Sequence, residues 1–437
     1  MAILGGALAL GCVLLLLALR MPLGLAMALV GACGLWIVDG ERSLIFVLSN
    51  APVDSLSNYT LSVVPLFILM GALAARGGLA SGLYKSANAL VGHYRGGLAT
   101  STILASGAFG AVCGSSLATV ATIGRIALPE MQRFGYSRAL AAGTVASGGT
   151  LGILIPPSVA MVIYAILTET SVGQLFLAGL VPGIIAIVLY ATTVAIWTRL
   201  NPGLAGPPQK PVPFVQRVLD QRHMLGMFTL FTVVVGGIVA GIFSPTEGAA
   251  IGVGMALLIG LVGGTLNASA ILESLRETAS FSVSLLFILL GIVIFEFFLN
   301  ALSFPQELAS FIRSFDAEPW QVVMIVLLVL ILLGCFLESL TVILLTVPVL
   351  HPLIVDMDLN LIWWGIVMVV TIELGLVTPP VGLNVYVMAR MVPDLDLWTA
   401  FRGVAPFVVT DLLRLALIVT IPAISLWLPD LVYGGLL

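Results

Sequence analysis

The sequence contains very little charge. Lys, Arg, Asp and Glu make up 9% of its 437 residues, whereas 60% are hydrophobic, and the mean hydropathy is +1.18. Soluble globular proteins carry about 25% charged residues. Apolar runs of roughly 20 residues, each long enough to cross a bilayer as a helix, recur along the whole chain. This composition excludes a soluble globular domain and predicts an all-α polytopic membrane protein.

Several functional motifs are also missing. No GxxxxGK[ST] phosphate loop occurs, which disfavours a primary pump. The three histidines are scattered, and no Ser, His and Asp cluster suggests an intramembrane enzyme, so we predict neither enzyme activity nor a cofactor. The four cysteines form no CxxC pair and are typical of small buried hydrophobic residues. With Lys and Arg totalling 17 and a net charge of −4, the chain has no basic patch for nucleic acid.

The apolar runs predict the membrane crossings. The first run has no basic leading region and no clear cleavage site, so we interpret it as a retained span rather than a signal peptide. Crossings are expected near residues 2–19, 22–39, 59–76, 138–168, 172–198, 224–243, 246–264, 279–300, 361–391 and 400–428.

Two further apolar segments, 97–131 and 320–352, do not fit as single crossings. Each contains two short apolar arms around a polar middle, "CGSSLAT" (113–119) and "GCFLESLT" (334–341). Arms that short cannot each span the bilayer comfortably. The pattern is that of a re-entrant helical hairpin, which enters and leaves on one side.

The basic residues give the orientation. If both segments are hairpins, two basic residues, Arg42 and Arg313, face one side, and Arg414 lies inside the last span. The others fall on or towards the opposite side: Arg20, Arg76, Lys85, Arg95, Arg125, Arg133, Arg138, Arg199, Lys210, Arg217, Arg222, Arg276, Arg390 and Arg402. By the positive-inside rule that side is the cytoplasm. Both termini are then periplasmic, and the polar stretch 199–223 is a cytoplasmic linker.

The two hairpin regions are copies of each other. At a fixed offset of 223 residues Ser116 matches Ser339, Leu151–Gly152 matches Leu374–Gly375, and Pro156–Pro157 matches Pro379–Pro380. Five predicted crossings separate the hairpins, and an odd number gives the copies opposite orientations. This is an inverted-topology repeat, an architecture common among secondary transporters, whose sites lie where discontinuous helices meet.

Glycines and adjacent prolines interrupt a long apolar run in each copy. Breaking a helix in lipid frees backbone N–H and C=O groups, which cost several kcal/mol each unless something receives them. Carbonyls at the ends of half-helices suit Na⁺, and half-helix N-termini suit a carboxylate. The sequence therefore predicts two broken helices that meet two hairpin tips and bind sodium and an organic anion.

The candidate residues follow from this pairing. Sodium site 1 is predicted at Gly114, Ser115, Ser116, Gly149, Thr150 and Gly152, and sodium site 2 at Glu338, Ser339, Thr341, Gly375 and Thr378. The predicted substrate-binding residues are Ser115, Ser116, Pro156, Pro157, Thr341, Pro379 and Asn384. No metal other than sodium is expected.

Four polar residues have two interpretations. Asn384 could reach a substrate oxygen or form a helix–helix hydrogen bond. Glu338 could be functional or could cap a short arm. Asp411 and Arg414 are spaced as an i,i+3 ion pair, for which we favour a structural role.

At these residues the chain resembles the large membrane subunit of the tripartite ATP-independent periplasmic (TRAP) transporters. The resemblance covers essentially the whole chain. It is carried by "PLFILMGALAARGGLA", "GAVCGSSLATVATIGRIALPEMQRFGYSRALAAGTVASGGTLGILIPPS", "FSPTEGAAIGV" and "ELGLVTPPVGLNVYVMAR".

The resemblance implies an elevator-type, ion-transporter-like fold in the bacterial inner membrane, in which a transport domain slides against a scaffold, driven by Na⁺. It also implies a periplasmic substrate-binding protein, a separate small subunit of about four spans, and a carboxylate substrate. A self-contained sodium/carboxylate symporter and an anion channel are the alternatives. A channel would need a continuously lined pore, whereas one inverted repeat with paired sites favours alternating access.

These expectations divide the chain into seven segments. They are scaffold helices (1–80), an interfacial arm helix (81–96), the first transport-domain half (97–170), scaffold helices with the linker (171–300), a second interfacial arm helix (301–319), the second transport-domain half (320–395) and a last helix (396–437).

Overall fold

The computed structural model describes residues 2–57, 59–315, 318–392 and 395–434, and the regular elements among them are helices. Positions 1, 58, 316–317, 393–394 and 435–437, which belong to predicted segments, lie outside the described residues. The first half of the chain contains α1 (Ala2–Ala18), α2 (Leu23–Asp39), α3 (Glu41–Ser57), η1 (Tyr59–Ser62), α4 (Val63–Arg76), α5 (Leu79–Val91), α6 (Gly97–Cys113), α7 (Ser116–Arg133), α8 (Arg138–Leu154), α9 (Val159–Thr168) and α10 (Val172–Leu200).

The second half begins after the linker, which contains η2 (Pro202–Leu204) and α11 (Phe214–Asp220). It consists of α12 (Arg222–Val239), α13 (Pro245–Val262), α14 (Ala268–Ala301), α15 (Phe304–Arg313), α16 (Pro319–Phe336), α17 (Ser339–Asp356), α18 (Leu361–Val377), α19 (Leu383–Met391), α20 (Leu397–Thr420) and α21 (Ala423–Tyr433).

Many of these helices are long and apolar enough to cross a membrane. By length and composition, seven spans qualify among the described residues, or eight if the bent pair Thr60–Arg76 and Leu79–Val91 counts as one. The seven are Arg138–Thr168, which is α8 with α9, and α10, α13, α14, α16, α17 and α20. The chain is therefore a multi-pass membrane protein, as the composition predicts.

The repeat extends over nearly the whole chain. Helices α7 and α17, and likewise α8 and α18, begin and end 223 residues apart, and α9 with α19 and α2 with α13 agree to within one residue at their ends. The long α14 stands where the first copy has α3, η1 and α4, and α15 stands where it has α5. The two halves thus place the same elements in the same order.

The structure differs from the sequence prediction at three places. Helix α3 lies in a stretch where no span was predicted, because its Ser, Asn, Asp and Pro residues keep its hydropathy low. The prediction of a single last helix is wrong, because α20 ends at Thr420 and α21 begins at Ala423. The helix breaks here because Pro422 cannot donate a helical hydrogen bond. The arms α6, α7, α16 and α17 are 17 or 18 residues long, longer than expected.

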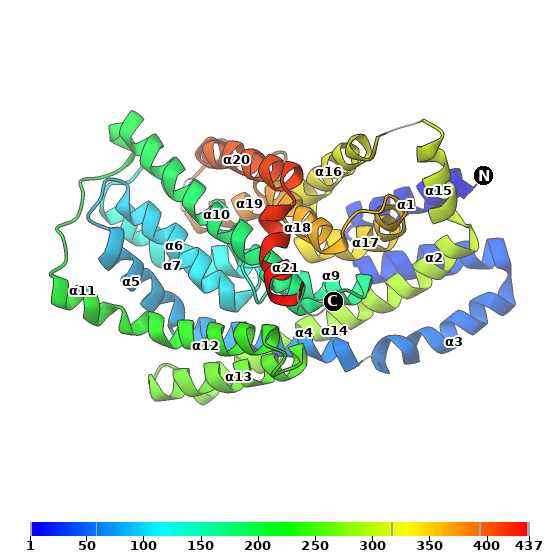
Figure 1. Ribbon diagram of the computed structural model, residues 1–437, viewed down its shortest axis with the longest axis horizontal. Coiled ribbons are helices and arrows are strands. Elements are labelled where there is room, and N and C mark those ends of the chain that lie inside the picture. The colour runs from blue at the N-terminus through cyan, green and yellow to red at the C-terminus, as the bar shows by residue number, and fades with distance from the viewer. Residues whose placement is uncertain (1, 58, 316–317, 393–394, 435–437) are drawn as a thin grey trace.

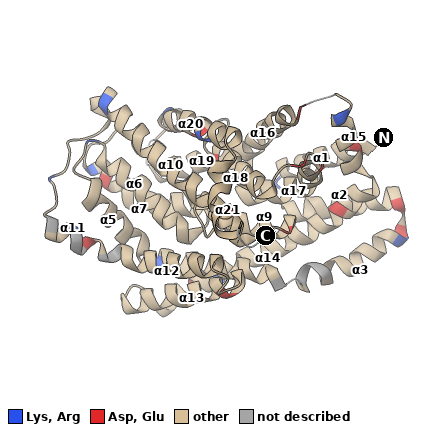
Figure 2. Cartoon of the chain, in the orientation of Figure 1, with Lys and Arg blue, Asp and Glu red and all other residues tan. Residues whose placement is uncertain are grey.

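The molecule is elongated (Figure 1). Helices α1, α2, α3, α14 and α15 lie towards one end, α5, α6, α7 and α11 lie at the other, and α18, α20 and α21 lie between them. Charged residues are sparse and lie mostly near helix ends and in loops (Figure 2). The interrupted helices are the most enclosed, because every residue of α8 from Leu140 and of α18 from Ile362 is buried. Apolar character on all sides is typical of such core helices.

Glycines let the main helices pack backbone against backbone. Helix α2 contacts α14 where an added Cβ on Gly291 would lie 2.1 Å from the Gly24 oxygen. On α8, an added Cβ on Gly143 would lie 1.9 Å from the carbonyl oxygen of Gly403 on α20. Small residues at such crossings allow the close approach that stabilises helix pairs in membranes.

Substituting Gly143 with Ala should destabilise the protein, because the added methyl group meets backbone that cannot rotate away. Overpacking of this kind costs about 1–3 kcal/mol. We expect a lower unfolding temperature in detergent, measured by the fluorescence of a thiol-reactive dye. The matched control is Gly254→Ala on α13, where the added Cβ has no neighbour within 4 Å. Equal unfolding temperatures for both variants would contradict the described packing of α8 on α20.

Candidate functional site

The first interruption lies between α8 and α9, and the turn between α6 and α7 packs against it. Gly114 adopts a left-handed conformation, with φ of 63°, which favours glycine. A Cβ there would lie 3.1 Å from the Pro157 oxygen. A Cβ on Gly152 would lie 2.8 Å from the Ser115 oxygen. The structure therefore brings Gly114, Ser115 and Gly152 of predicted sodium site 1 into contact.

The other residues of predicted site 1 lie on two faces of α8. Gly149 faces α7, since its Cβ would lie 3.2 Å from the Ser116 oxygen. Thr150 faces elsewhere: its hydroxyl donates to the Ser147 carbonyl at 2.7 Å and lies 3.1 Å from the Tyr190 hydroxyl of α10. The Thr150 side chain is thus directed at α10, so its backbone would have to supply any ligand atom to site 1.

The second interruption lies between α18 and α19, against the turn between α16 and α17. The Gly382 N–H donates to the Cys335 carbonyl at 3.1 Å, and the Cys335 thiol donates to the Pro379 carbonyl at 3.3 Å. A Cβ on Gly375 would lie 2.7 Å from the Gly334 Cα. The Thr378 hydroxyl donates to the Leu374 carbonyl of its own helix at 2.5 Å. The second pair of helices therefore meets the second break as the first pair meets the first.

The prolines explain why both helices end where they do. Proline has no N–H, so Pro156 and Pro157 cannot donate to the carbonyls of Gly152 and Ile153, and Pro380 cannot donate to that of Leu376. Helices α8 and α18 accordingly end at Leu154 and Val377. The last turn of each helix presents carbonyl oxygens that lack their helical donors, as the sequence predicts.

Asn384 connects the two halves. Its side-chain nitrogen donates to the Ser116 hydroxyl at 2.7 Å and to the Ala146 carbonyl of α8 at 3.2 Å. Asn384 is fully buried. The structure thus shows the helix–helix hydrogen bond, one of the two roles predicted for Asn384.

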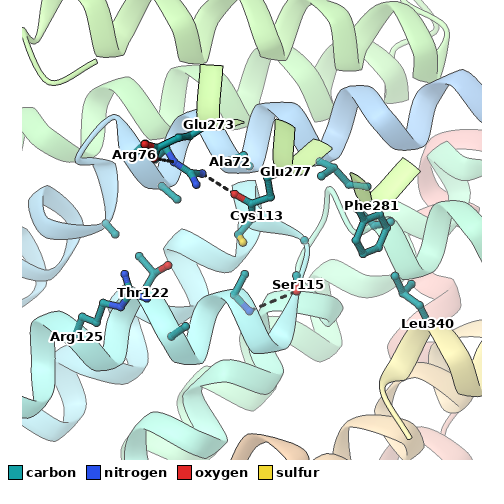
Figure 3. A pocket seen from close by; sticks show the side chains of 18 of the residues that line it. Ala72, Arg76, Cys113, Ser115, Thr122, Arg125, Glu273, Glu277, Phe281 and Leu340 are labelled. Carbon is teal, nitrogen blue, oxygen red and sulfur yellow. Dashed lines mark hydrogen bonds and ion pairs between the residues drawn. The ribbon is translucent and has the colours of Figure 1, made fainter. Parts of the chain in front are cut away.

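A cavity of about 620 Å³ opens beside both turns (Figure 3). One wall comes from α4 and α14, where Arg76 pairs with Glu277 at 2.6 Å and with Glu273 at 3.6 Å. The facing wall comes from α7, with Thr122 and Arg125, and from Ser115 directly before it. The other predicted residues on the lining are Gly114, Glu338 and Ser339.

The remaining predicted residues do not line this cavity. They are Ser116, Gly149, Thr150, Gly152, Pro156, Pro157, Thr341, Gly375, Thr378, Pro379 and Asn384. Glu338 stands before the first residue of α17 without a capping hydrogen bond from its side chain. The sequence interpretation missed Arg76, Arg125, Glu273 and Glu277. Of these four, Arg125 could have been recognised from the sequence as a candidate cavity residue, because it is a charged residue nine positions beyond Ser116 within an apolar arm.

A model of the tripartite ATP-independent periplasmic transporter, DctM component, matches residues 10–424. The chain belongs to this TRAP large-permease family. It is 38% identical to the C4-dicarboxylate TRAP transporter large permease protein DctM of Pseudomonas aeruginosa, with 90% of each chain covered. It is 32% identical to the sialic acid TRAP transporter large permease protein SiaM of Vibrio cholerae (95% and 96% covered).

Other relatives extend the comparison. The ectoine TRAP transporter large permease protein TeaC of Halomonas elongata is 30% identical (96% and 97% covered). Among solved structures, the Alcanivorax borkumensis YdaH transporter shares the fold, with a TM-score of 0.61 at 15% identity over 92% of this TRAP permease and 90% of that chain. The relatives in sequence are named as transporter permeases, which supports a transporter rather than an enzyme.

Gly152→Ala should abolish uptake by this TRAP permease, because the added methyl group would push the α6–α7 turn away from the first break. The clash involves the Ser115 carbonyl at 2.8 Å and the Thr119 hydroxyl at 2.5 Å. Uptake of radiolabelled substrate by cells that express the whole transporter is the measurement. Gly236→Ala on α12, where the nearest atom is 3.9 Å away, should keep wild-type uptake. Normal uptake by Gly152→Ala at equal expression would show that this contact is dispensable.

Proposed function

We propose that the chain mediates sodium-coupled uptake of an organic carboxylate across the bacterial inner membrane. The observation that carries this proposal is that the turns of both helix pairs reach one cavity, each beside an interrupted helix. Transporters built from repeated halves hold substrate and coupling ions where such discontinuous helices meet. Family membership makes transport the function that this geometry serves.

A carboxylate is the substrate group that the cavity favours. Arg76 is already paired with two glutamates on its wall. Arg125 on the facing wall is exposed, and the described residues provide it with no ion pair. A guanidinium group matches the geometry of a carboxylate with two parallel hydrogen bonds. The relatives named for C4-dicarboxylates, sialic acid and ectoine all concern molecules that carry a carboxylate.

Sodium is the coupling ion that the two breaks favour. In the last turn of α8 the carbonyls of Gly152 and Ile153 lack helical donors, and the carbonyl of Ser115 lies close by. The last turn of α18 offers the Leu376 carbonyl in the same way. Unwound carbonyls and hydroxyl groups of this kind coordinate Na⁺ in discontinuous transporter helices. The proposed ligands are the residues of sodium sites 1 and 2, with Thr150 contributing through its backbone.

An elevator movement fits the arrangement of the helices. Helices α2, α4, α13 and α14 pack on one another and would form the scaffold, while α6 to α8 and α16 to α20 form the packed body that carries both breaks. The cavity lies between α4 and α14 on one side and the two turns on the other. Sliding of one body past the other would expose the site alternately to each face. We propose that the small subunit enlarges the scaffold and that a periplasmic binding protein delivers the substrate.

Reconstitution in liposomes tests the whole proposal. The chain, its small subunit and its substrate-loaded binding protein are combined, and uptake of radiolabelled succinate, sialic acid or ectoine is followed. We expect uptake only when an inward Na⁺ gradient and the loaded binding protein are both present, because weak binding of free substrate at the membrane site would not support uptake.

Two outcomes would contradict the proposal separately. Full uptake in Na⁺-free medium with a proton gradient would refute sodium as the coupling ion. Robust uptake by the isolated chain would refute the need for partners and identify a self-contained symporter.

A further inference from the structure

A chain of polar side chains runs through the core between the two interrupted helices. It begins at Thr150 on α8, whose hydroxyl lies 3.1 Å from the Tyr190 hydroxyl of α10. Tyr190 donates to Asp411 of α20, with oxygen–oxygen distances of 2.6 and 2.7 Å. Arg414 of α20 then joins Asp411 at 3.0 Å to Glu373 of α18 at 3.1 Å. All five side chains are fully buried.

The two ends of this chain are equivalent positions of the repeat. Thr150 and Glu373 lie 223 residues apart, the offset that relates α8 to α18. Each stands two residues before the glycine that contacts the neighbouring helix pair, Gly152 or Gly375. The polar chain thus links equivalent positions near the C-terminal ends of the two interrupted helices.

Burying these charges is costly, which argues against simple packing. Ionised groups inside a membrane protein are expensive, and a buried ion pair can lose more in desolvation than it gains in attraction. A single nitrogen, Arg414 Nη2, contacts both Asp411 and Glu373, while Glu373 Oε1 and Arg414 Nε and Nη1 lack partners among the described residues. Because the two carboxylates share this nitrogen, a displacement of one changes the position of the other.

We propose that this chain couples the two interrupted helices, with Tyr190 and Arg414 as positioning residues. A displacement at the first break moves Thr150, and the Tyr190 hydroxyl transmits it through Asp411 and Arg414 to Glu373 and the second break. Asn384, which bonds to Ser116 and to the Ala146 carbonyl, is a second and separate contact between the halves. This coupling needs no bound ion, so its test is independent of the proposed sodium sites.

The protein contains a natural reporter beside each break. Cys113 ends α6 and Cys335 lies near the end of α16, and both thiols are buried, whereas Cys12 and Cys33 are exposed and can be replaced by Ala. The experiment measures the rate at which N-ethylmaleimide labels each thiol in the purified chain, with peptide mass spectrometry as the readout. The first break is disturbed by Gly152→Ala. If this variant does not fold, Ser115→Ala is used instead, because it removes the N-cap of α7.

We expect the disturbance to raise the labelling rate of Cys113 directly and that of Cys335 remotely, by roughly 2- to 10-fold for the remote effect. Tyr190→Phe removes only the linking hydroxyl and keeps the ring that packs on Phe407. In that background the remote increase at Cys335 should fall to about half or less, with other contacts between the halves, such as those of Asn384 and Tyr164, carrying the rest. Coupling is reciprocal, so Gly375→Ala should raise Cys113 labelling through the same residues.

The matched control is Tyr136→Phe, which removes another buried tyrosine hydroxyl, one that accepts a hydrogen bond from the Leu98 N–H at 3.2 Å within the first half of the protein. It should leave the remote increase unchanged. The inference is overturned if Cys335 does not respond to the disturbance in the parent protein, or if Tyr190→Phe and Tyr136→Phe preserve the response equally.

Discussion

Paired prolines within two enclosed helices impose the constraint on which the structure depends. Each pair removes N–H donors, so carbonyls in the last turns of α8 and α18 lose their helical partners at membrane depth. Water cannot satisfy them in a lipid environment, and the protein must surround them. The Gly114–Ser115 turn packs against the first break and the end of α16, at Gly334 and Cys335, packs against the second, and glycines at 152 and 375 allow the backbones to approach. Compensation of these interruptions accounts for the close packing of each helix pair against its break.

The repeat places the same packed break in each half, and polar contacts connect the two halves. Asn384 crosses from the second break to Ser116 and α8, and the buried chain from Thr150 to Glu373 crosses on the α10 and α20 side. Helix α8 therefore contacts the second half directly through the Ala146 carbonyl and indirectly through Tyr190 of α10. Such connections favour a body that moves as a unit, which is what an elevator requires of its transport domain.

Local patterns in the sequence were sufficient to predict the elements that carry chemistry. The prolines at 156–157 and 379–380, with the glycines before them, located both breaks, and the offset of 223 paired α7 with α17 and α8 with α18. Helix α3 was not predicted, because its polar residues lower the mean hydropathy of this stretch. The break at Pro422 was missed because a single proline in an apolar run is compatible with a continuous, kinked helix.

Contacts between distant segments could not be predicted in this way. The pairing of Arg76 with Glu277, the aim of Thr150 at Tyr190, and the bond from Asn384 to Ser116 join residues 40 to 268 positions apart. Neither hydropathy nor spacing specifies which faces of two helices meet. The cavity, and the position of Arg125 on its wall, therefore required the three-dimensional structure.

The central claim is that both breaks lie in one body that moves against the wall formed by α4 and α14. Distances between spin labels in nanodiscs containing the complete transporter test it most directly. One pair joins Leu272 of α14 to Arg133 of α7, and the other joins Arg133 to Trp398 of α20, all at exposed positions. On adding Na⁺ and loaded binding protein, the account predicts that the first distance shifts by about 5 Å or more while the second stays constant. A change in the second distance with the first unaltered would contradict it and indicate local gating within the body.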